Sequence, residues 1–287
     1  MTFNFYTMTR LLLLVCVSGL AAFPAVSQEE AKSPDEIAKE LANPNTPLAS
    51  LNFKNQFRLF DGDLPNAGDQ WNYTMLFQPS LPFALDNGDL LLWRPAVPLI
   101  VEQSIWDYGK LDFENETGLG DIGFDLAYAH TSDTGILTAF GLFTTLPTAS
   151  SSNLGTGRWS IGPELLVGKL TESYVLGIFP NHQWDIAGWS DNDVNVTTTQ
   201  VFATFLPGGG WNVGTSPIIS YDWNSEQWSI PINLTIGKTV VIGGKPWKIG
   251  VEANYYVEQS DSFGPEWMFG FNITPVIKNP LAGIFKR

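Results

Sequence analysis

The stretch that decides the fold is Trp71-Asn72-Tyr73-Thr74-Met75-Leu76-Phe77-Gln78. Its odd-numbered residues are all large and apolar, and its even-numbered residues are polar except Leu76. This period of two is typical of a β-strand with one apolar and one polar face, because successive side chains point to opposite sides of a sheet. The alternation recurs from about Leu48 onward, for example from Asp121 to Tyr128. We count about twelve such segments.

The residue types on the two faces distinguish a membrane barrel from a soluble, lectin-like β-sandwich, which also has one apolar face. The polar face carries mostly Gly, Ala, Ser, Thr and Asn, rather than the Lys, Glu and Arg that cover a face in bulk water. Trp opens several segments, at Trp71, Trp159, Trp228, Trp247 and Trp267, as in the aromatic girdles of membrane barrels. We therefore predict an all-β fold, an antiparallel transmembrane β-barrel of about twelve strands over residues 48–287.

Composition agrees with this class. Charged residues make up 15% of the 287 residues, against about 25% in an ordinary soluble domain. The formal net charge of −14 argues against general nucleic-acid binding, which needs a basic face.

The amino terminus resembles a bacterial export signal. Arg10 precedes the apolar run Leu11 to Phe23, which ends at Pro24, and Ala25 and Ser27 are small residues at the positions that signal peptidase inspects. We expect residues 1–27 to be the signal peptide. The protein is then predicted to reside in the outer membrane of the Gram-negative cell envelope, where a barrel without disulfides is stabilised by its hydrogen-bonded sheet.

Residues 28–47 are predicted to be a periplasmic lead-in with one short helix. Ser33-Pro34-Asp35-Glu36 has the spacing of a capping box, and Asn43-Pro44 ends the apolar run that follows. This helix could plug a pore, lie on the membrane surface, pack on a partner or simply lead into the barrel.

The predicted connectors alternate in length. Short turns are expected near Asp86-Asn87-Gly88, Ser132-Asp133, 169–173, 207–210 and Gly243-Gly244. Longer connectors are expected at 61–70, 97–117, 147–157, 185–193, 223–227 and 259–266. The longer set is strongly acidic and contains Lys110 as its only base, so it should attract cations; alternatively, the acids keep the loops solvated or hold divalent ions against lipopolysaccharide phosphates.

Polar and ionisable residues on the inner register are the candidates for lining the lumen, because charges facing lipid are heavily penalised. They are Arg94, Asp121, Asp125, Glu164, His182, Asp222, Asn233 and Glu252. They could form a polar path or a ligand site, or they could be a salt-bridge network that braces the wall. Four Asn-x-Thr pairs within strands, beginning at Asn72, Asn195, Asn233 and Asn272, are also expected to point inward.

Signals for chemistry are few. His130 and His182 make no metal-ligand spacing, and Gly-x-Ser-x-Gly is absent. We predict no catalytic residues, no metal, no cofactor and no enzymatic activity.

Five stretches carry a resemblance to a known family. They are Leu41-Ala42-Asn43-Pro44, Gly118-Leu119-Gly120-Asp121-Ile122, Leu146-Pro147-Thr148-Ala149, Asn181-His182-Gln183-Trp184 and Tyr221 to Leu234. They resemble a family of bacterial outer-membrane transporters often labelled neuromedin U, which is similar to barrel proteins grouped with meta-pathway phenol degradation. The resemblance implies a barrel of twelve or so strands that takes up small molecules, hydrophobic or aromatic ones among them. It brings no catalytic or binding residues to this sequence.

The sequence thus predicts a porin-like channel or facilitator for passive uptake of small solutes. Its expected partners are outer-membrane lipid, lipopolysaccharide, the barrel-assembly machinery and a small-molecule solute. One alternative is a closed structural or adhesive envelope barrel, and another is a membrane-embedded hydrolase.

Overall fold

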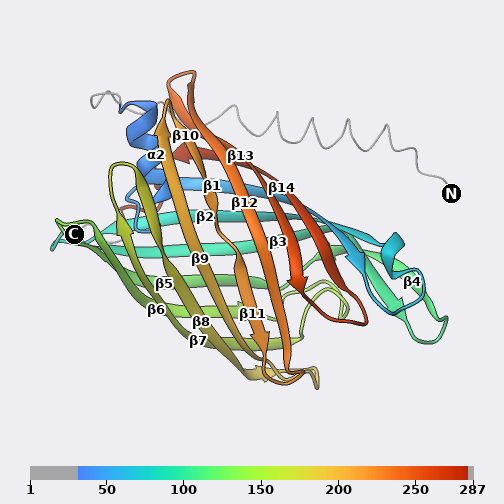
Figure 1. The fold of residues 1–287 in the computed structure, drawn as a ribbon. Coiled ribbons are helices and arrows are strands. Elements are labelled where there is room, and N and C mark those ends of the chain that lie inside the picture. Colours follow the sequence, from blue (N-terminus) through green and yellow to red (C-terminus); the bar gives the residue numbers. More distant parts are fainter. Residues whose placement is uncertain (1–31, 284–287) are drawn as a thin grey trace. The chain divides into compact units, whose positions relative to one another are not determined.

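Antiparallel strands make up most of residues 32–283, the part of the chain that the computed structural model describes (Figure 1). The predicted signal peptide, residues 1–27, lies outside the described residues. The elements are α2 (Pro34–Ala42), β1 (Ala49–Asp61), the 3-10 helix η1 (Ala67–Asp69), β2 (Trp71–Ala84), β3 (Leu90–Asp107), β4 (Asp112–Leu119), β5 (Ile122–Thr131), β6 (Ile136–Leu146), β7 (Arg158–Leu170), β8 (Tyr174–Gly188), β9 (Asn195–Gly208), β10 (Trp211–Thr215), β11 (Ile218–Asp222), β12 (Gln227–Ile242), β13 (Lys245–Glu258) and β14 (Gly264–Ile277).

The fourteen strands occupy twelve positions in a closed ring. β4 and β5 both pair with β3, one after the other, and β10 and β11 both lie between β9 and β12. Each of these two positions is therefore one interrupted strand; the second interruption is at Ser216 and Pro217, and a proline has no amide hydrogen for the ladder. Pairing of β1 with β14 and of β12 with β13 closes the ring. The prediction of about twelve strands is confirmed.

Alternation divides the outer face of the ring from its inner face. On β12, Ile232 and Leu234 are 64% and 54% exposed, whereas Asn233 between them is 7% exposed. Exposed aliphatic and aromatic side chains repeat at every second position of most strands, such as Leu126 and Tyr128 on β5. The outer face is therefore apolar, and strand pairing runs all the way around the ring in the described part of the chain, except that β4 at the long-loop end pairs with β3 alone.

The connectors at one end of the ring, the short-turn end, lie where the sequence places them. They span residues 85–89, 132–135, 171–173, 209–210 and 243–244. Gly243 and Gly244 have φ of 58° and 75°, the left-handed values that a two-residue hairpin requires.

The other end, the long-loop end, differs from the prediction in one place. The predicted connector 97–117 is mostly strand, because β3 continues to Asp107 and pairs with β4 as an extended hairpin.

The predicted helix is present as α2. The Ser33 hydroxyl accepts a hydrogen bond from the Glu36 amide, the Glu36 side chain accepts one from the Ser33 amide, and Pro34 occupies the first turn. Asn43 ends the helix, as the sequence predicts. Within residues 32–283, no helix has the length and apolar character needed to cross a bilayer.

Candidate functional site

A cluster of three charged side chains lies on the inner face of β3, β5 and β7. Nε and Nη2 of Arg94 lie 2.7 Å and 2.6 Å from Oδ2 of Asp125, and Nη2 lies 3.7 Å from Oε1 of Glu164. The three side chains are 15%, 6% and 4% exposed, respectively. The Phe179 ring of β8 lies under the guanidinium, with its centroid 4.9 Å from Cζ. These charges are thus mutually compensated and largely withdrawn from bulk water.

Strand register explains why these residues meet. Arg94 lies opposite Asp125 in the β3–β5 ladder, so their side chains share a face at close range. Glu164 lies opposite Gly141 of β6, the strand between β5 and β7. Because Gly141 has no side chain, Glu164 can extend across β6 toward Arg94.

The cluster retains free hydrogen-bond acceptors. Within the described part of the chain, Oδ1 of Asp125, Oε1 of Glu164 and Oδ1 of Asn181 accept no hydrogen bond. Asn181 lies opposite Glu164 in the β7–β8 ladder. The cluster can therefore accept hydrogen bonds from a solute in the interior.

Charged and polar side chains also line the inner face of β1, β13 and β14. Asn272 of β14 lies opposite Lys54 of β1, and its Nδ2 donates to Oε1 of Glu252 at 3.4 Å. Lys54 lies within electrostatic reach of both Glu252 and Arg94, and Lys248 lies within reach of Lys54. The two sides of the interior are thus coupled by their charges.

The connector 147–157 folds inward at the long-loop end. Gly118 lies on the inner face of β4, and a Cβ built on it would lie 2.0 Å from Oγ of Ser150 and 2.8 Å from Cδ1 of Leu154. Leu154 is 7% exposed. Oδ2 of Asp121 accepts from the amide of Thr156 at 2.7 Å, which ties the end of the loop to the start of β5. The loop therefore narrows the interior near its long-loop end.

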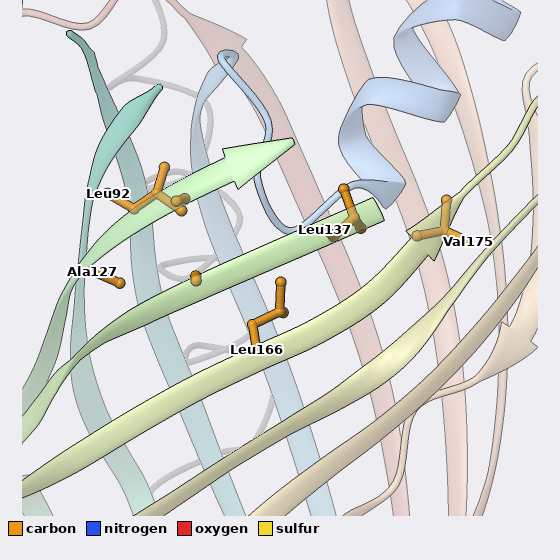
Figure 2. Packing of buried hydrophobic residues seen from close by; sticks show 7 residues of the cluster. Leu92, Ala127, Leu137, Leu166 and Val175 are labelled. Atoms are coloured by element: carbon orange, nitrogen blue, oxygen red, sulfur yellow. The ribbon is translucent and has the colours of Figure 1, made fainter. Parts of the chain in front are cut away.

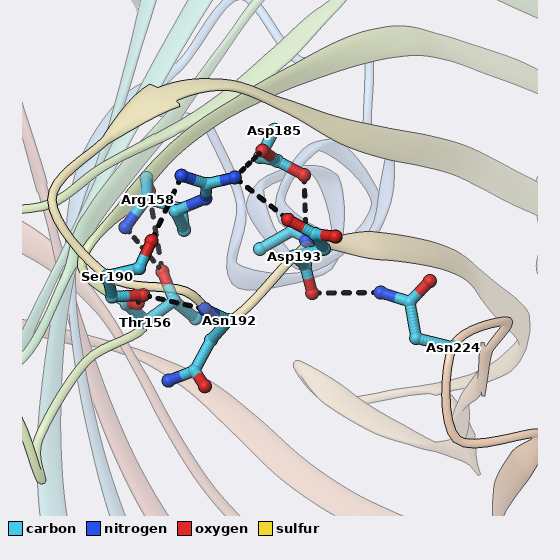
Figure 3. A network of polar contacts seen from close by, with 8 residues as sticks. Thr156, Arg158, Asp185, Ser190, Asn192, Asp193 and Asn224 are labelled. Atoms are coloured by element: carbon cyan, nitrogen blue, oxygen red, sulfur yellow. Dashed lines mark hydrogen bonds and ion pairs between the residues drawn. The ribbon is translucent and has the colours of Figure 1, made fainter.

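A polar network joins this loop to two neighbouring connectors (Figure 3). Nη2 of Arg158 lies 2.6 Å from Oδ2 of Asp185 and 2.9 Å from Oδ1 of Asp193, and its Nη1 donates to the Ser190 carbonyl at 3.0 Å. Nδ2 of Asn224 donates to the Asp193 carbonyl at 2.9 Å. The connectors after β6, β8 and β11 are therefore held as one unit.

The interior near the short-turn end is aliphatic (Figure 2). The cluster consists of Leu92, Ala127, Ala129, Leu137, Ala139, Leu166 and Val175, all on inward positions, and Ala42 at the end of α2 packs against it. Leu137 and Val175 are 0% exposed. This part of the inner face departs from the mostly small and polar residues expected there, because Leu137, Leu166 and Val175 pack together on the inner side of three adjacent strands.

Comparison with solved structures supports this architecture. The described fold is similar to the crystal structure of an outer membrane channel from Pseudomonas putida F1, with a TM-score of 0.62 and 12% sequence identity, over 88% of this chain and 100% of that chain. The fold is that of an outer-membrane barrel. A NanC porin, 13% identical over 79% of this chain and 99% of that one, gives a TM-score of 0.48. Phospholipase A of the Escherichia coli outer membrane, 10% identical over 87% and 99%, gives 0.44. No family model and no curated protein sequence matches the chain.

Several candidate lumen residues line the barrel interior. Arg94, Asp125 and Glu164 form one cluster. Glu252 contacts Asn272 on the far side. Asn233 is 7% exposed, and its Nδ2 donates to Oδ1 of Asn254 at 2.9 Å.

The other three candidates make different contacts. Asp121 holds the connector 147–157 instead of joining the Arg94 cluster. Asp222 accepts from the amide of Asn224 at 2.8 Å and so caps the turn after β11. His182 lies on the outer face, on the same side of β8 as Ile178 and Trp184, and its Nδ1 lies 2.7 Å from Oγ1 of Thr197.

The Asn-x-Thr pairs divide in the same way. The pairs at Asn72, Asn233 and Asn272 lie on the inner face, where Oδ1 of Asn72 accepts from the Ser104 amide at 2.8 Å. The expectation is wrong for Asn195 and Thr197, which lie on the outer face of β9. Their position close to the long-loop end explains this, because the Trp223 indole donates to Oγ1 of Thr197 there at 2.9 Å.

Sequence reasoning missed Lys54, Lys248 and Arg158 as interior or rim charges. Lys54 alternates with Phe53 and Phe57 of β1, so the period of two could have identified it. Among residues 32–283, no three His, Cys, Asp or Glu side chains are arranged to hold a metal ion.

Proposed function

We propose that this protein is an outer-membrane channel of a Gram-negative bacterium, through which small molecules diffuse passively. One observation carries the proposal: the polarity of the ring is inverted. Its outer face is apolar, while Arg94, Asp125, Glu164, Lys54 and Glu252 lie inside. A soluble protein has the opposite distribution, whereas a closed sheet with lipid outside and a polar path inside has this one.

The finer assignment follows from the motifs quoted above. We infer membership of the outer-membrane transporter family often labelled neuromedin U, with small hydrophobic or aromatic molecules among its solutes. The fold shared with the Pseudomonas putida F1 outer membrane channel supports the coarser class. Outer-membrane lipid and lipopolysaccharide would contact the apolar face, and the barrel-assembly machinery would insert the chain.

The test is single-channel conductance of the purified protein in planar bilayers. We expect discrete conductance steps with a preference for cations. Glu252→Gln should lower the cation-to-anion permeability ratio by up to about sevenfold, since a unit charge about 7 Å from a passing ion in water attracts a cation and repels an anion by roughly 0.6 kcal/mol each.

The matched control is Glu258→Gln, the same change at an exposed position at the end of the same strand. The control should leave the ratio nearly unchanged. Folded protein that conducts no ions would contradict the channel.

A closed structural barrel is the second candidate, and two observations favour it. The aliphatic cluster fills part of the interior at the short-turn end, and connector 147–157 narrows it at the other. If the protein conducts no ions, and deletion of its gene leaves the attachment of the outer membrane to the cell wall unchanged, the closed structural barrel is excluded along with the channel.

Nothing in the geometry favours the hydrolase. Nδ1 of His130 lies 2.5 Å from Oδ1 of Asp89, and Nδ1 of His182 contacts Thr197. Within the described residues, neither ring is hydrogen-bonded to a serine.

A further inference from the structure

The helix α2 is fastened to the short-turn end of the barrel at three separate places. Nζ of Lys39 lies 2.5 Å from Oε1 of Glu172 in the β7–β8 turn. Oδ1 of Asp35 accepts from the Gly210 amide in the β9–β10 turn at 2.5 Å. Nδ2 of Asn45, just after the helix, donates to carbonyls of β5 and β6 at 3.0 Å and 3.1 Å. These places lie on three consecutive strand pairs, and α2 also contacts β12 and β13, so the segment 35–45 extends over the mouth from β5 to β13.

The apolar side of α2 faces the protein. Ile37 and Ala38 are 4% and 3% exposed, and Ala42 packs on the aliphatic cluster of the interior. Figure 2 shows the helix passing Leu137 and Val175, which belong to that cluster. The helix thus closes the mouth over an apolar interior.

The closure is not tightly packed. A cavity of about 730 Å³ lies between α2 and the mouth, and its lining includes Gly88 and Glu172 of two short turns, Gly208 at the end of β9, and Glu40 and Asn45. Oε2 of Glu40 and Oδ1 of Asn45 accept no hydrogen bond in the described structure. A segment that leaves such a space beneath it buries little area and separates more easily than one packed without voids.

The three attachments differ in strength. The Glu172 side chain is 91% exposed, so its ion pair with Lys39 is weak and screened by salt. Asn45 is 4% exposed, and both amide hydrogens of its side chain are bonded, which makes it the firmer attachment. The helix ends at Asn43, two residues before this attachment. The segment 35–45 is therefore held firmly at Asn45 and weakly at Lys39.

We propose that α2 is a movable plug of this barrel. It closes the short-turn end when the contacts of Asp35 and Lys39 are made, and it opens by swinging about the turn 43–45 when they are released. The inference rests on the proposed channel function, since a plug is useful only where solute passes. It assigns to the chain its own gate at the mouth opposite the long loops.

A disulfide tests the plug directly. A Cβ built on Gly210 would lie 3.4 Å from Cβ of Pro34, close to the mean of about 3.8 Å in disulfides, and 2.3 Å from the Thr239 carbonyl oxygen, so the β9–β10 turn must shift to accept a cysteine. Pro34→Cys with Gly210→Cys then supplies the only two cysteines of the predicted mature chain, because Cys16, the only native cysteine, lies in the predicted signal peptide. We expect the oxidised protein to show at least fivefold lower mean conductance in planar bilayers than the same protein after reduction by dithiothreitol.

A charge reversal gives a second test that does not disturb Gly210, whose φ of 76° disfavours any side chain. Lys39→Glu should raise the open probability about two- to fivefold, the range for loss of one exposed ion pair. Lys39→Glu with Glu172→Lys should restore it. The matched control is Lys32→Glu, because Lys32 pairs with Glu40 of α2 and not with the barrel.

The outcomes separate the two proposals. Ion conductance that is equal in the oxidised and reduced protein, and unchanged by Lys39→Glu, overturns the plug and leaves the channel standing. Absence of conductance from folded wild-type, reduced and charge-reversed protein alike overturns the channel and the plug together.

Discussion

Replacing Arg94 by Met should destabilise the barrel more than any other change of a single charged residue on its inner face. The substitution keeps most of the side-chain volume but leaves Asp125 and Glu164, 6% and 4% exposed, without a cation. Breaking a buried ion pair by removing one partner costs about 3–5 kcal/mol. This corresponds to a change of roughly two hundred- to several thousand-fold in the unfolding equilibrium constant. Urea unfolding in lipid vesicles, followed by tryptophan fluorescence, measures the difference.

Two companion variants make this result interpretable. Arg58→Met removes an inner arginine whose Nη2 donates to the neutral Gln56 at 2.8 Å, so its cost should be only about 1 kcal/mol. Arg94→Met combined with Asp125→Asn and Glu164→Gln should recover much of the lost stability, because no uncompensated charge then stays buried. If Arg94→Met costs no more than Arg58→Met, the cluster does not act as a compensated ion-pair network and the reasoning is refuted.

Three further predictions concern the interior and the plug. Leu137→Ala should lower the free energy of unfolding by about 2–5 kcal/mol, because Leu137 is 0% exposed in the aliphatic cluster. Phe140→Ala on the outer face should lower it much less. Urea unfolding in vesicles compares the two variants. Ser33→Ala removes the bond to the Glu36 amide at 3.2 Å and should destabilise α2 by about 1 kcal/mol, seen as faster proteolysis of that helix. The Ser33 amide donates to the Glu36 carboxylate and holds the pKa of Glu36 below its ordinary 4.5. The stabilisation of α2 by this bond is therefore complete above pH 4.5 and is lost as the pH falls through the lowered pKa. Proteolysis of α2 should accelerate in acid in the wild type and depend less on pH in Glu36→Gln.

The features that could be predicted from the sequence are those set by neighbouring residues. Alternation between Trp71 and Gln78 fixes a strand and its two faces, since a period of two leaves no other regular structure. The pair Gly243-Gly244 fixes a hairpin because both residues adopt positive φ. The capping box at Ser33 fixes the start of α2, because the reciprocal bonds with Glu36 are local.

The features that the sequence left open depend on residues far apart in the chain. Alternation assigns Arg94 and Glu164 to the inner face, but it cannot show that Gly141 leaves room for them to meet. The inward fold of connector 147–157 depends on Asp121, which precedes that connector by a whole hairpin. His182 was misplaced because Asn181, His182 and Gln183 are polar at three successive positions, and only the register of His182 with Ile178 and Trp184 shows that it points outward.

The division of each strand between lipid and lumen is the central claim, and a cysteine scan along β12 tests it most directly. In the chain that begins after the predicted signal peptide and therefore has no native cysteine, residues 232–235 are replaced one at a time by Cys, and each is given a nitroxide label in reconstituted vesicles. Collision with oxygen, which concentrates in the acyl chains, should be high at Ile232 and Leu234 and low at Asn233 and Thr235. Equal collision rates at all four positions, or the opposite alternation, would contradict the account.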